Sequence, residues 1–193
     1  MLEIKLTPEF LNSLVFNNPW SEYPTDNYHH AGVILPLIIH QSGPTVLLVE
    51  KRKSSSYPWS GQIALPGGRR EPIDASNVET ALREMDEEVG LVAENIEVIG
   101  KIGAFRTLGN VLIHSFLGVS STEPTDFFLK SEISRVLEVP LSILLEQHQE
   151  YLGKVPSIEE LIYPVEGNKI WGATARIMYT FLEAVFQCFQ TDS

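Results

Sequence analysis

Four carboxylates lie close together in the last turns of one short predicted helix. No other feature of the 193-residue sequence limits the possible folds and functions as strongly. The carboxylates belong to Glu84, Asp86, Glu87 and Glu88, and Gly90 follows them. Acidic side chains at helical neighbour spacing repel one another, and anions near a helix C-terminus oppose the helix dipole. Because hard divalent ions such as Mg²⁺ bind carboxylate oxygens and keep positions open for phosphate, the pattern indicates a metal site.

The residues around these acids define the helix and its two faces. Ser76 and Glu79 form a Ser-x-x-Glu capping box that predicts where the helix begins, and Gly90 predicts where it ends. A buried stripe is predicted at apolar positions of helical spacing: Val78, Leu82, Met85 and Val89. A second face, turned away from this stripe, is predicted for three of the acids: Glu84, Glu87 and Glu88.

Two glycines and one arginine flank the acidic face. Gly67 and Gly68 allow a turn that brings backbone close to the carboxylates or to a ligand. Arg83 lies beside the acidic face and is spaced to pair with Glu87 one helical turn later. We expect Arg83 to orient the glutamates rather than to touch a substrate.

The stretch 83–91 resembles the second half of the Nudix box, the signature of the Nudix hydrolases. Its order Arg-Glu-Met-Asp-Glu-Glu-Val-Gly-Leu matches the family pattern at every defined position. The first half departs, because Asp74 stands where the family has Glu and the gap from Asp74 to Arg83 is one residue longer. This longer loop resembles the coenzyme A branch of the family. The alternative is a solvated acidic helix with an ordinary salt-bridged face, which a match of this length disfavours.

The resemblance to the coenzyme A branch continues outside the box. Upstream, Arg52, Gly61 and the run Pro66-Gly67-Gly68 keep the spacing of a motif of that branch. Four positions of this motif differ from the branch pattern: Glu50, Lys53, Tyr57 and Leu65. The stretches 137–141 and 170–176 also look like that branch, so the resemblance spans residues 31–186.

The resemblance implies roles for particular residues. The metal, Mg²⁺ or Mn²⁺, would be held by Glu84, Glu87 and Glu88 with backbone of Gly68, and Arg83 completes the catalytic set. The substrate would be bound by Arg52, Lys53, Tyr57, Gly67 and Gly68. Tyr57 replaces an arginine that meets substrate phosphate in the branch, and Lys53 restores part of that charge only as a point charge. Tyr57 and Trp59 either stack on an adenine ring or pack beneath their loop.

Other candidate residues have competing interpretations. The general base is either Glu84 or Glu132, and the alternative for Glu132 is an ordinary surface acid. The pair His29-His30 could bind a metal, but we expect it to be merely exposed. His114 is expected within a strand, in a structural role, and Cys188 within the core rather than as a nucleophile.

The function implied by the resemblance is metal-dependent hydrolysis of a diphosphate linkage. Coenzyme A or an acyl derivative would give 3′,5′-ADP and 4′-phosphopantetheine or its acyl form. One alternative is ADP-ribose or another nucleotide substrate of a Nudix pyrophosphohydrolase. A second is a non-catalytic, nucleotide-binding regulator with the Nudix fold, which the complete acidic half of the box disfavours.

Composition sets the outer bounds. The length fits one domain over residues 1–193, with an N-terminal extension at 1–30 and the family core at 31–186. The formal charge of −11 argues against nonspecific binding of nucleic acid and requires local Arg, Lys and metal to attract a phosphorylated small molecule. One cysteine excludes an internal disulfide and fits a reducing, cytoplasmic location. We expect no signal peptide and no membrane span, and a homodimer is possible.

Hydrophobic patterns predict the remaining elements. Apolar runs at 31–39 and 45–52 predict a β-hairpin, and 96–102 and 111–119 predict further strands. Short helices are expected from Thr7 and over 140–146, and a long helix over 174–189. Trp171 and the aromatic residues of the last helix are expected in the core. The Nudix resemblance supplies the arrangement, an α/β/α sandwich with a mixed β-sheet between helices.

Overall fold

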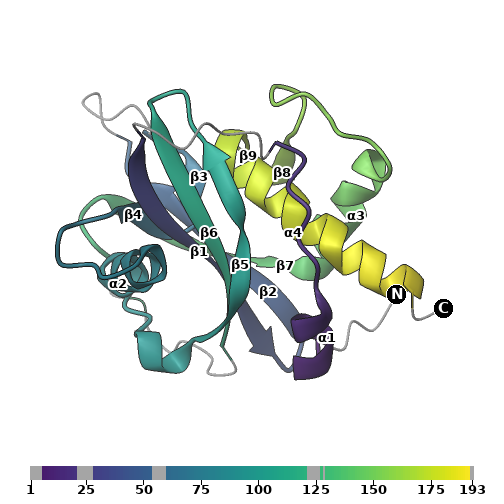
Figure 1. Ribbon diagram of the computed structural model, residues 1–193, viewed down its shortest axis with the longest axis horizontal. Coiled ribbons are helices and arrows are strands. Elements are labelled where there is room, and N and C mark those ends of the chain that lie inside the picture. Colours follow the sequence, from purple (N-terminus) through teal and green to yellow (C-terminus); the bar gives the residue numbers. More distant parts are fainter. Residues whose placement is uncertain (1–5, 21–27, 54–59, 121–126, 128, 192–193) are drawn as a thin grey trace.

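A computed structural model describes residues 6–20, 28–53, 60–120, 127 and 129–191 of the chain. One mixed sheet lies between helices, with α2 (Asn77–Val89) on one face and α3 (Leu141–His148) and α4 (Gly172–Thr191) on the other (Figure 1). This arrangement confirms the predicted α/β/α sandwich. None of the described helices is long and apolar enough to cross a membrane.

Within the described residues the central sheet has seven strands, five of them in the spatial order β3-β2-β1-β6-β5. Strand β4 pairs with β1, and β7 pairs with β2. Among the described strands of this sheet, β1 and β6 pair in parallel and the other pairings are antiparallel. The strands are β1 (His29–His40), β2 (Gly43–Lys51), β3 (Ile63–Ala64), β4 (Gly67–Arg69), β5 (Glu97–Arg106), β6 (Val111–Ser120) and β7 (Ile133–Pro140).

The predicted hairpin is confirmed as β1 and β2, paired from Leu37 with Val46 to His40 with Gly43. The strands predicted at 96–102 and 111–119 are confirmed as β5 and β6. The sequence analysis did not identify β7, although it joins the sheet beside β2, nor the separate hairpin of β8 (Tyr163–Val165) and β9 (Asn168–Ile170).

Alternation along β1 sorts its side chains into two cores. Ile34 and Ile38 pack with Ala81 and Met85 of α2, whereas Leu35 and the other odd-numbered core positions join the larger cluster formed with α3 and α4. Gly32 lies on the α2 side, where an added Cβ would come within 2.1 Å of the Asn77 carbonyl oxygen. The sheet therefore allows the N-terminal end of α2 to approach β1 very closely.

Helix α2 has the predicted ends but a different buried face. The Ser76 hydroxyl accepts a hydrogen bond from the Glu79 amide, and Gly90 caps the other end with φ +73°. The predicted stripe is partly wrong, because Val78 and Leu82 are only half-buried. The buried positions are Thr80, Ala81, Met85, Glu88 and Val89. Close contact at Gly32 turns Ala81 toward the sheet, and Glu88 is consequently buried rather than on an outward face.

The remaining helices follow their sequence signals. Helix α1 (Pro8–Ser13) is capped by Thr7, and α3 and α4 correspond to the helices expected near 140–146 and 174–189. Single 3₁₀ turns occur at Ala93–Asn95 and Gln149–Tyr151. Cys188 is half-buried and packs against the core near Ser13 of α1. Trp171 is 46% exposed, so its predicted place in the core is wrong.

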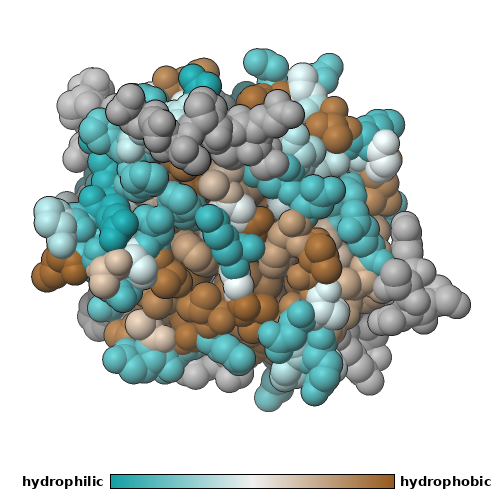
Figure 2. All heavy atoms as spheres, viewed as in Figure 1, coloured by the Kyte–Doolittle hydropathy of each residue, from teal (hydrophilic) through white to brown (hydrophobic). Residues whose placement is uncertain are grey.

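The face in Figure 2 is mixed in character. Hydrophilic side chains lie mainly at the left and the upper right of this view, and hydrophobic ones gather below the middle, between α2 and α1. The overall polarity of this face therefore does not mark a functional site.

Candidate active site

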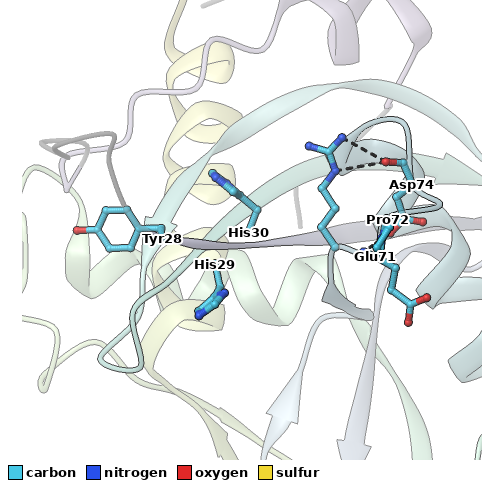
Figure 3. A pocket seen from close by; sticks show the side chains of 7 residues that line it. Tyr28, His29, His30, Glu71, Pro72 and Asp74 are labelled. Atoms are coloured by element: carbon cyan, nitrogen blue, oxygen red, sulfur yellow. Dashed lines mark hydrogen bonds between the residues drawn. The ribbon is translucent and has the colours of Figure 1, made fainter.

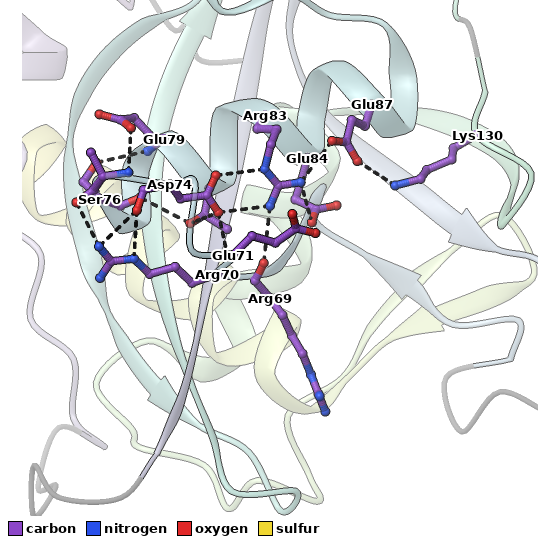
Figure 4. A network of polar contacts seen from close by, with 12 residues as sticks. Arg69, Arg70, Glu71, Asp74, Ser76, Glu79, Arg83, Glu84, Glu87 and Lys130 are labelled. Atoms are coloured by element: carbon purple, nitrogen blue, oxygen red, sulfur yellow. Dashed lines mark hydrogen bonds and ion pairs between the residues drawn. The ribbon is translucent and has the colours of Figure 1, made fainter.

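The loop between β4 and α2 is fixed by a buried carboxylate, Asp74. Its oxygens accept hydrogen bonds from the Glu71 amide at 2.9 Å and the Thr80 hydroxyl at 3.0 Å. Arg83 donates to both oxygens, from Nε at 2.9 Å and from Nη2 at 3.1 Å (Figure 4). Hydrogen bonding from Arg83 holds the pKa of Asp74 well below its usual range although burial opposes this shift. Asp74 thus ties the loop to the helix that carries the glutamates.

Arg83 connects this loop to the acidic face. Its Nη1 donates to Glu84 Oε1 at 3.0 Å and to Glu87 Oε1 at 3.1 Å, and its Nη2 also donates to the Arg69 carbonyl at 3.3 Å. The predicted pairing of Arg83 with Glu87 is confirmed. The hydrogen bond to Asp74 is the main reason that the pKa of Arg83 is raised, so the guanidinium stays charged. These contacts give Arg83 the geometry of a residue that orients glutamates.

Glu87 is shared between Arg83 and a lysine from another part of the chain. Lys130 Nζ lies 2.7 Å from Glu87 Oε2 and 3.8 Å from Glu132 Oε1. The hydrogen bond from Lys130 is the largest cause that lowers the pKa of Glu87. Glu132 immediately precedes β7, and its carbonyl accepts a hydrogen bond from the Arg52 amide at 2.7 Å. The fold therefore brings Glu132 to the border of the acidic face.

Glu88 is in a different environment from Glu87. Its side chain is 1% exposed, its Oε1 contacts Lys51 Nζ, and its Oε2 accepts a hydrogen bond from the Gly67 amide at 3.2 Å. Burial raises the pKa of the Glu88 carboxyl, and the charge of Lys51 opposes this rise. The sequence analysis did not identify Lys51. The available signal was a lysine two residues after the buried apolar run 46–49 of β2, at helix-facing strand spacing from Val49.

Both glycines of the preceding turn are required by close contacts. A Cβ at Gly68 would lie 2.4 Å from the Glu84 carboxylate, so backbone and carboxylate are packed directly together. Gly67 has φ +150°, and its Cβ would lie 2.4 Å from the Gly32 carbonyl oxygen. The expectation that these glycines bring backbone close to the acids is confirmed.

The predicted substrate residues are only partly described by the structure. Arg52 and Lys53 are exposed just beyond the end of β2, and the aliphatic part of Lys53 lies near Gly61. The predictions for Tyr57 and Trp59 fall outside the described residues. Arg52 and Lys53 therefore place two positive charges directly after Lys51. They lie at the end of β2 that borders the acidic face of α2.

No three His, Cys, Asp or Glu side chains within the described ranges converge tightly enough to hold a metal ion as they stand. Each of the three glutamates instead contacts a cationic side chain: Glu84 contacts Arg83, Glu87 contacts Lys130, and Glu88 contacts Lys51. The donor chemistry nevertheless fits a hard divalent cation, which prefers carboxylate oxygens. Glu84 also lies near enough to Glu88 to raise its pKa further.

A cleft of about 400 Å³ lies beside the loop, lined by Tyr28, His29, His30, Arg70, Glu71, Pro72 and Asp74 (Figure 3). Arg70 donates to the Asp74 and Ala75 carbonyls, so it supports the loop from the cleft side. His29 and His30 are exposed as predicted.

His114 lies within β6, as predicted, and its ring approaches the ring of His30. His30 Nδ1 lies 2.9 Å from His114 Nε2. Burial is the main cause that lowers the pKa of His114 to about 4. At neutral pH this half-buried ring is therefore uncharged.

Comparisons with known proteins identify the family of this chain. The family model described as the NUDIX domain matches residues 28–161. A curated relative, the uncharacterized Nudix hydrolase NudL of Photorhabdus laumondii, is 30% identical over 175 residues, covering 83% of this chain and 87% of its own length.

Solved structures share the fold at lower identity. A MutT/nudix family protein from Enterococcus faecalis has a TM-score of 0.57 and 16% identity, covering 88% of this chain and 70% of its own. The NUDIX domain of Shewanella oneidensis NrtR, solved with ADP ribose, has a TM-score of 0.50 and 23% identity, covering 65% and 82%. The sequence match over residues 28–161 together with the acidic helix shows that this chain belongs to the Nudix hydrolase family and is a pyrophosphohydrolase.

Proposed function

We propose that this protein hydrolyses the diphosphate linkage of coenzyme A or of an acyl-coenzyme A. The products would be 3′,5′-ADP and 4′-phosphopantetheine or its acyl form. The choice of substrate rests on the sequence resemblance over residues 31–186. A second candidate substrate is ADP-ribose, because the structurally similar domain from Shewanella oneidensis was solved in complex with ADP ribose.

The observation that carries the reaction type is the organised acidic face of α2. Glu84, Glu87 and Glu88 are each held in place by a cation, and Gly67 and Gly68 pack their backbone against two of these acids. Such a concentration of oriented carboxylates beside close-packed backbone supports metal-assisted hydrolysis of a phosphoanhydride.

The three glutamates would hold Mg²⁺ or Mn²⁺. When bound, such an ion neutralises charge on the diphosphate and lowers the pKa of the attacking water. Arg83 contributes by fixing the carboxylates of Glu84 and Glu87, and the Gly67 amide fixes that of Glu88. The exposed cations Arg52 and Lys53 would bind phosphate oxygens of the substrate, countering the overall charge of −11.

Two carboxylates are candidates for the general base that takes the proton from water. Glu84 has a side chain that is 12% exposed and is already hydrogen-bonded to Arg83. Glu132 is 34% exposed and lies near Lys130, which also contacts Glu87. We propose to separate them with Glu84→Gln and Glu132→Gln, because a base and a metal-holding residue affect Mn²⁺ affinity differently. If Glu132 is the base, Glu132→Gln should lose turnover while keeping Mn²⁺ affinity. If Glu84 is the base, Glu132→Gln should keep both, whereas Glu84→Gln should lose both because Glu84 also holds the metal.

A substrate panel tests the proposal. Coenzyme A, acetyl-coenzyme A, ADP-ribose, NADH, diadenosine polyphosphates and nucleoside triphosphates would be compared with Mg²⁺ or Mn²⁺, using Glu88→Gln and a chelator as blanks. Glu88-dependent release of 3′,5′-ADP from coenzyme A is the expected result. Preference for another diphosphate would overturn the substrate assignment and keep the reaction type. Nucleotide binding without turnover of any substrate would favour a non-catalytic regulator.

The cytoplasmic location and the homodimer stay predictions from the sequence. Size-exclusion chromatography with light scattering tests the second, and a monomeric mass would contradict it.

A further inference from the structure

We propose that Lys51 is the internal counter-cation of Glu88 and that a divalent metal ion enters this site by displacing the Lys51 ammonium. Lys51 would then determine how much metal is needed to load the enzyme. This inference rests on the proposed role of Glu88 as a metal-holding residue. It concerns the exchange between two cations, which the family resemblance does not address.

The first argument is the burial of the Glu88 carboxylate. It is 1% exposed and has two described partners, the Lys51 ammonium on Oε1 and the Gly67 amide on Oε2. A buried carboxylate that loses its only charged partner is strongly destabilising. Without metal, Lys51 is therefore the cation that makes an ionised Glu88 tolerable at this position.

The second argument is the placement of Lys51. Leu47 and Val49 of β2 face α2, and alternation along the strand puts Lys51 on the same side. The Lys51 amide donates to the Gln62 carbonyl at 2.9 Å, and the Lys51 carbonyl accepts from the Gly61 amide at 3.1 Å. Because its backbone is fixed, only the flexible side chain can leave Glu88. That side chain is 18% exposed, so part of it already borders solvent.

The third argument is charge repulsion. A metal ion on the Glu88 carboxylate would stand a few ångströms from an ammonium that still contacted the same group. Two positive charges this close repel strongly where solvent is largely excluded. The ammonium must therefore move away as the metal binds, and its departure is part of the free energy of metal binding.

Lys130 provides a matched contrast on the same helix face. It contacts Glu87 at 2.7 Å, but the two side chains are 39% and 41% exposed. Water and salt screen such a pair, so its removal changes little. The inference therefore predicts unequal effects for two lysines that both contact metal-site glutamates.

The experiment compares Lys51→Met with Lys130→Met in the full-length protein. Mn²⁺ affinity is measured from the electron paramagnetic resonance signal of free Mn²⁺, and thermal stability is measured with and without Mn²⁺. Lys51→Met should lower the melting temperature of the metal-free protein, and it should tighten Mn²⁺ binding about tenfold, equivalent to about 1.4 kcal/mol. The rise in melting temperature on adding Mn²⁺ should exceed that of the wild type. Lys130→Met should change each quantity much less.

Unchanged or weaker Mn²⁺ binding by Lys51→Met would overturn the inference. Lys51→Arg keeps the charge, so it should not bind Mn²⁺ more tightly than the wild type, and tighter binding would also count against displacement. If Lys51→Met folds only when Mn²⁺ is present, the result supports the inference because the metal then replaces the missing cation. If it folds under neither condition, the inference fails.

Glu88→Gln separates this inference from the proposed function. If Glu88→Gln loses Mn²⁺ binding but Lys51→Met has no effect on it, Glu88 holds the metal and the proposed displacement of Lys51 is wrong. Undiminished Mn²⁺ binding by Glu88→Gln, or no binding by the wild type, would overturn both the metal-holding role of Glu88 and its exchange with Lys51.

Discussion

Two groups of buried or half-buried acids lie on opposite sides of the sheet, and they are stabilised in different ways. On the α2 side, Glu84 contacts the Arg83 guanidinium and Glu88 contacts the Lys51 ammonium. On the α4 side, Glu183 contacts Nε2 of His148 at 3.1 Å, and Nδ1 of His148 lies 2.8 Å from the Tyr163 hydroxyl.

On the α4 side, Glu183 can be hydrogen-bonded by His148 without a positive charge on the imidazole ring. A neutral imidazole with its proton on Nε2 satisfies both contacts, since Nε2 donates to Glu183 and the Tyr163 hydroxyl donates to Nδ1. Burial lowers the pKa of His148 to about 4, which agrees with a neutral ring. The comparison teaches that neutral hydrogen bonds join α3 and α4 at His148 and Glu183, whereas the α2 group is a set of ion pairs. In our proposal a metal ion replaces one cation of that set.

The largest expected difference between the two groups is in catalysis. Glu88→Gln should reduce turnover about a thousandfold, because a bound metal ion contributes several kcal/mol to the transition state. Glu183→Gln should leave turnover within a few-fold of wild type. Steady-state kinetics of both variants, with circular dichroism to check folding, makes the comparison. Equal losses in the two variants would mean that the α2 acids have no special role.

The next effect concerns the stability of the α2 group. Asp74→Ala should destabilise the protein by about 3 kcal/mol, because it leaves the partly buried Arg83 without its main partner. The measurement is urea unfolding at pH 7. Because the pKa of Asp74 is lowered on folding, its contribution is present above the ordinary value of 3.8 and is lost as the pH falls below it. The free energy of unfolding of Asp74→Ala should therefore fall less steeply than that of the wild type as the pH drops below 3.8.

Stability of the α4 group should depend on a different pH range. His148 has a folded pKa of about 4, below its ordinary value of 6.5, so unfolding takes up protons between these values and stability falls as the pH drops through that window. His148→Phe should cost about 1–3 kcal/mol at pH 7, because Tyr163 and Glu183 lose their partner. Between pH 6.5 and 4 its stability should change less than that of wild type. Urea unfolding across this pH range measures the difference. If the free energy of unfolding depends on pH as steeply in His148→Phe as in the wild type, His148 is not the uncharged ring described above.

The smallest effect is expected at the exposed end of the α2 group. Lys130→Met should change stability by less than about 1 kcal/mol, because both partners of its ion pair are well hydrated. Salt titration of the melting temperature is the sharpest check, since a screened pair loses its contribution as salt rises. A loss comparable to that of Asp74→Ala would show that Lys130 is more deeply involved than its exposure suggests.

Local patterns predicted the helix that carries the site. The Ser76–Glu79 cap, the Gly90 end and the Arg83–Glu87 pair were all expected and are all present. Each depends on residues within about one turn of one another, where helical geometry alone decides which groups meet.

The surroundings of the glutamates were not predictable in this way. Lys51 and Glu88 are 37 residues apart in sequence, and Lys130 and Glu87 are 43 apart. Asp74 was noted only as a departure from the family pattern, although it is the main partner of Arg83. These contacts depend on where β2 and the segment before β7 pass the helix, which no local spacing reveals.

The sequence by itself determined the acidic helix, its ends, its glycine turn and the four long strands β1, β2, β5 and β6, because capping, periodicity and backbone freedom act over a few residues. Only the tertiary structure decided that Glu88 is buried against Lys51 while Glu87 remains exposed beside Lys130. The rotation of α2 on β1, set by close packing at Gly32, is the physical reason for that difference.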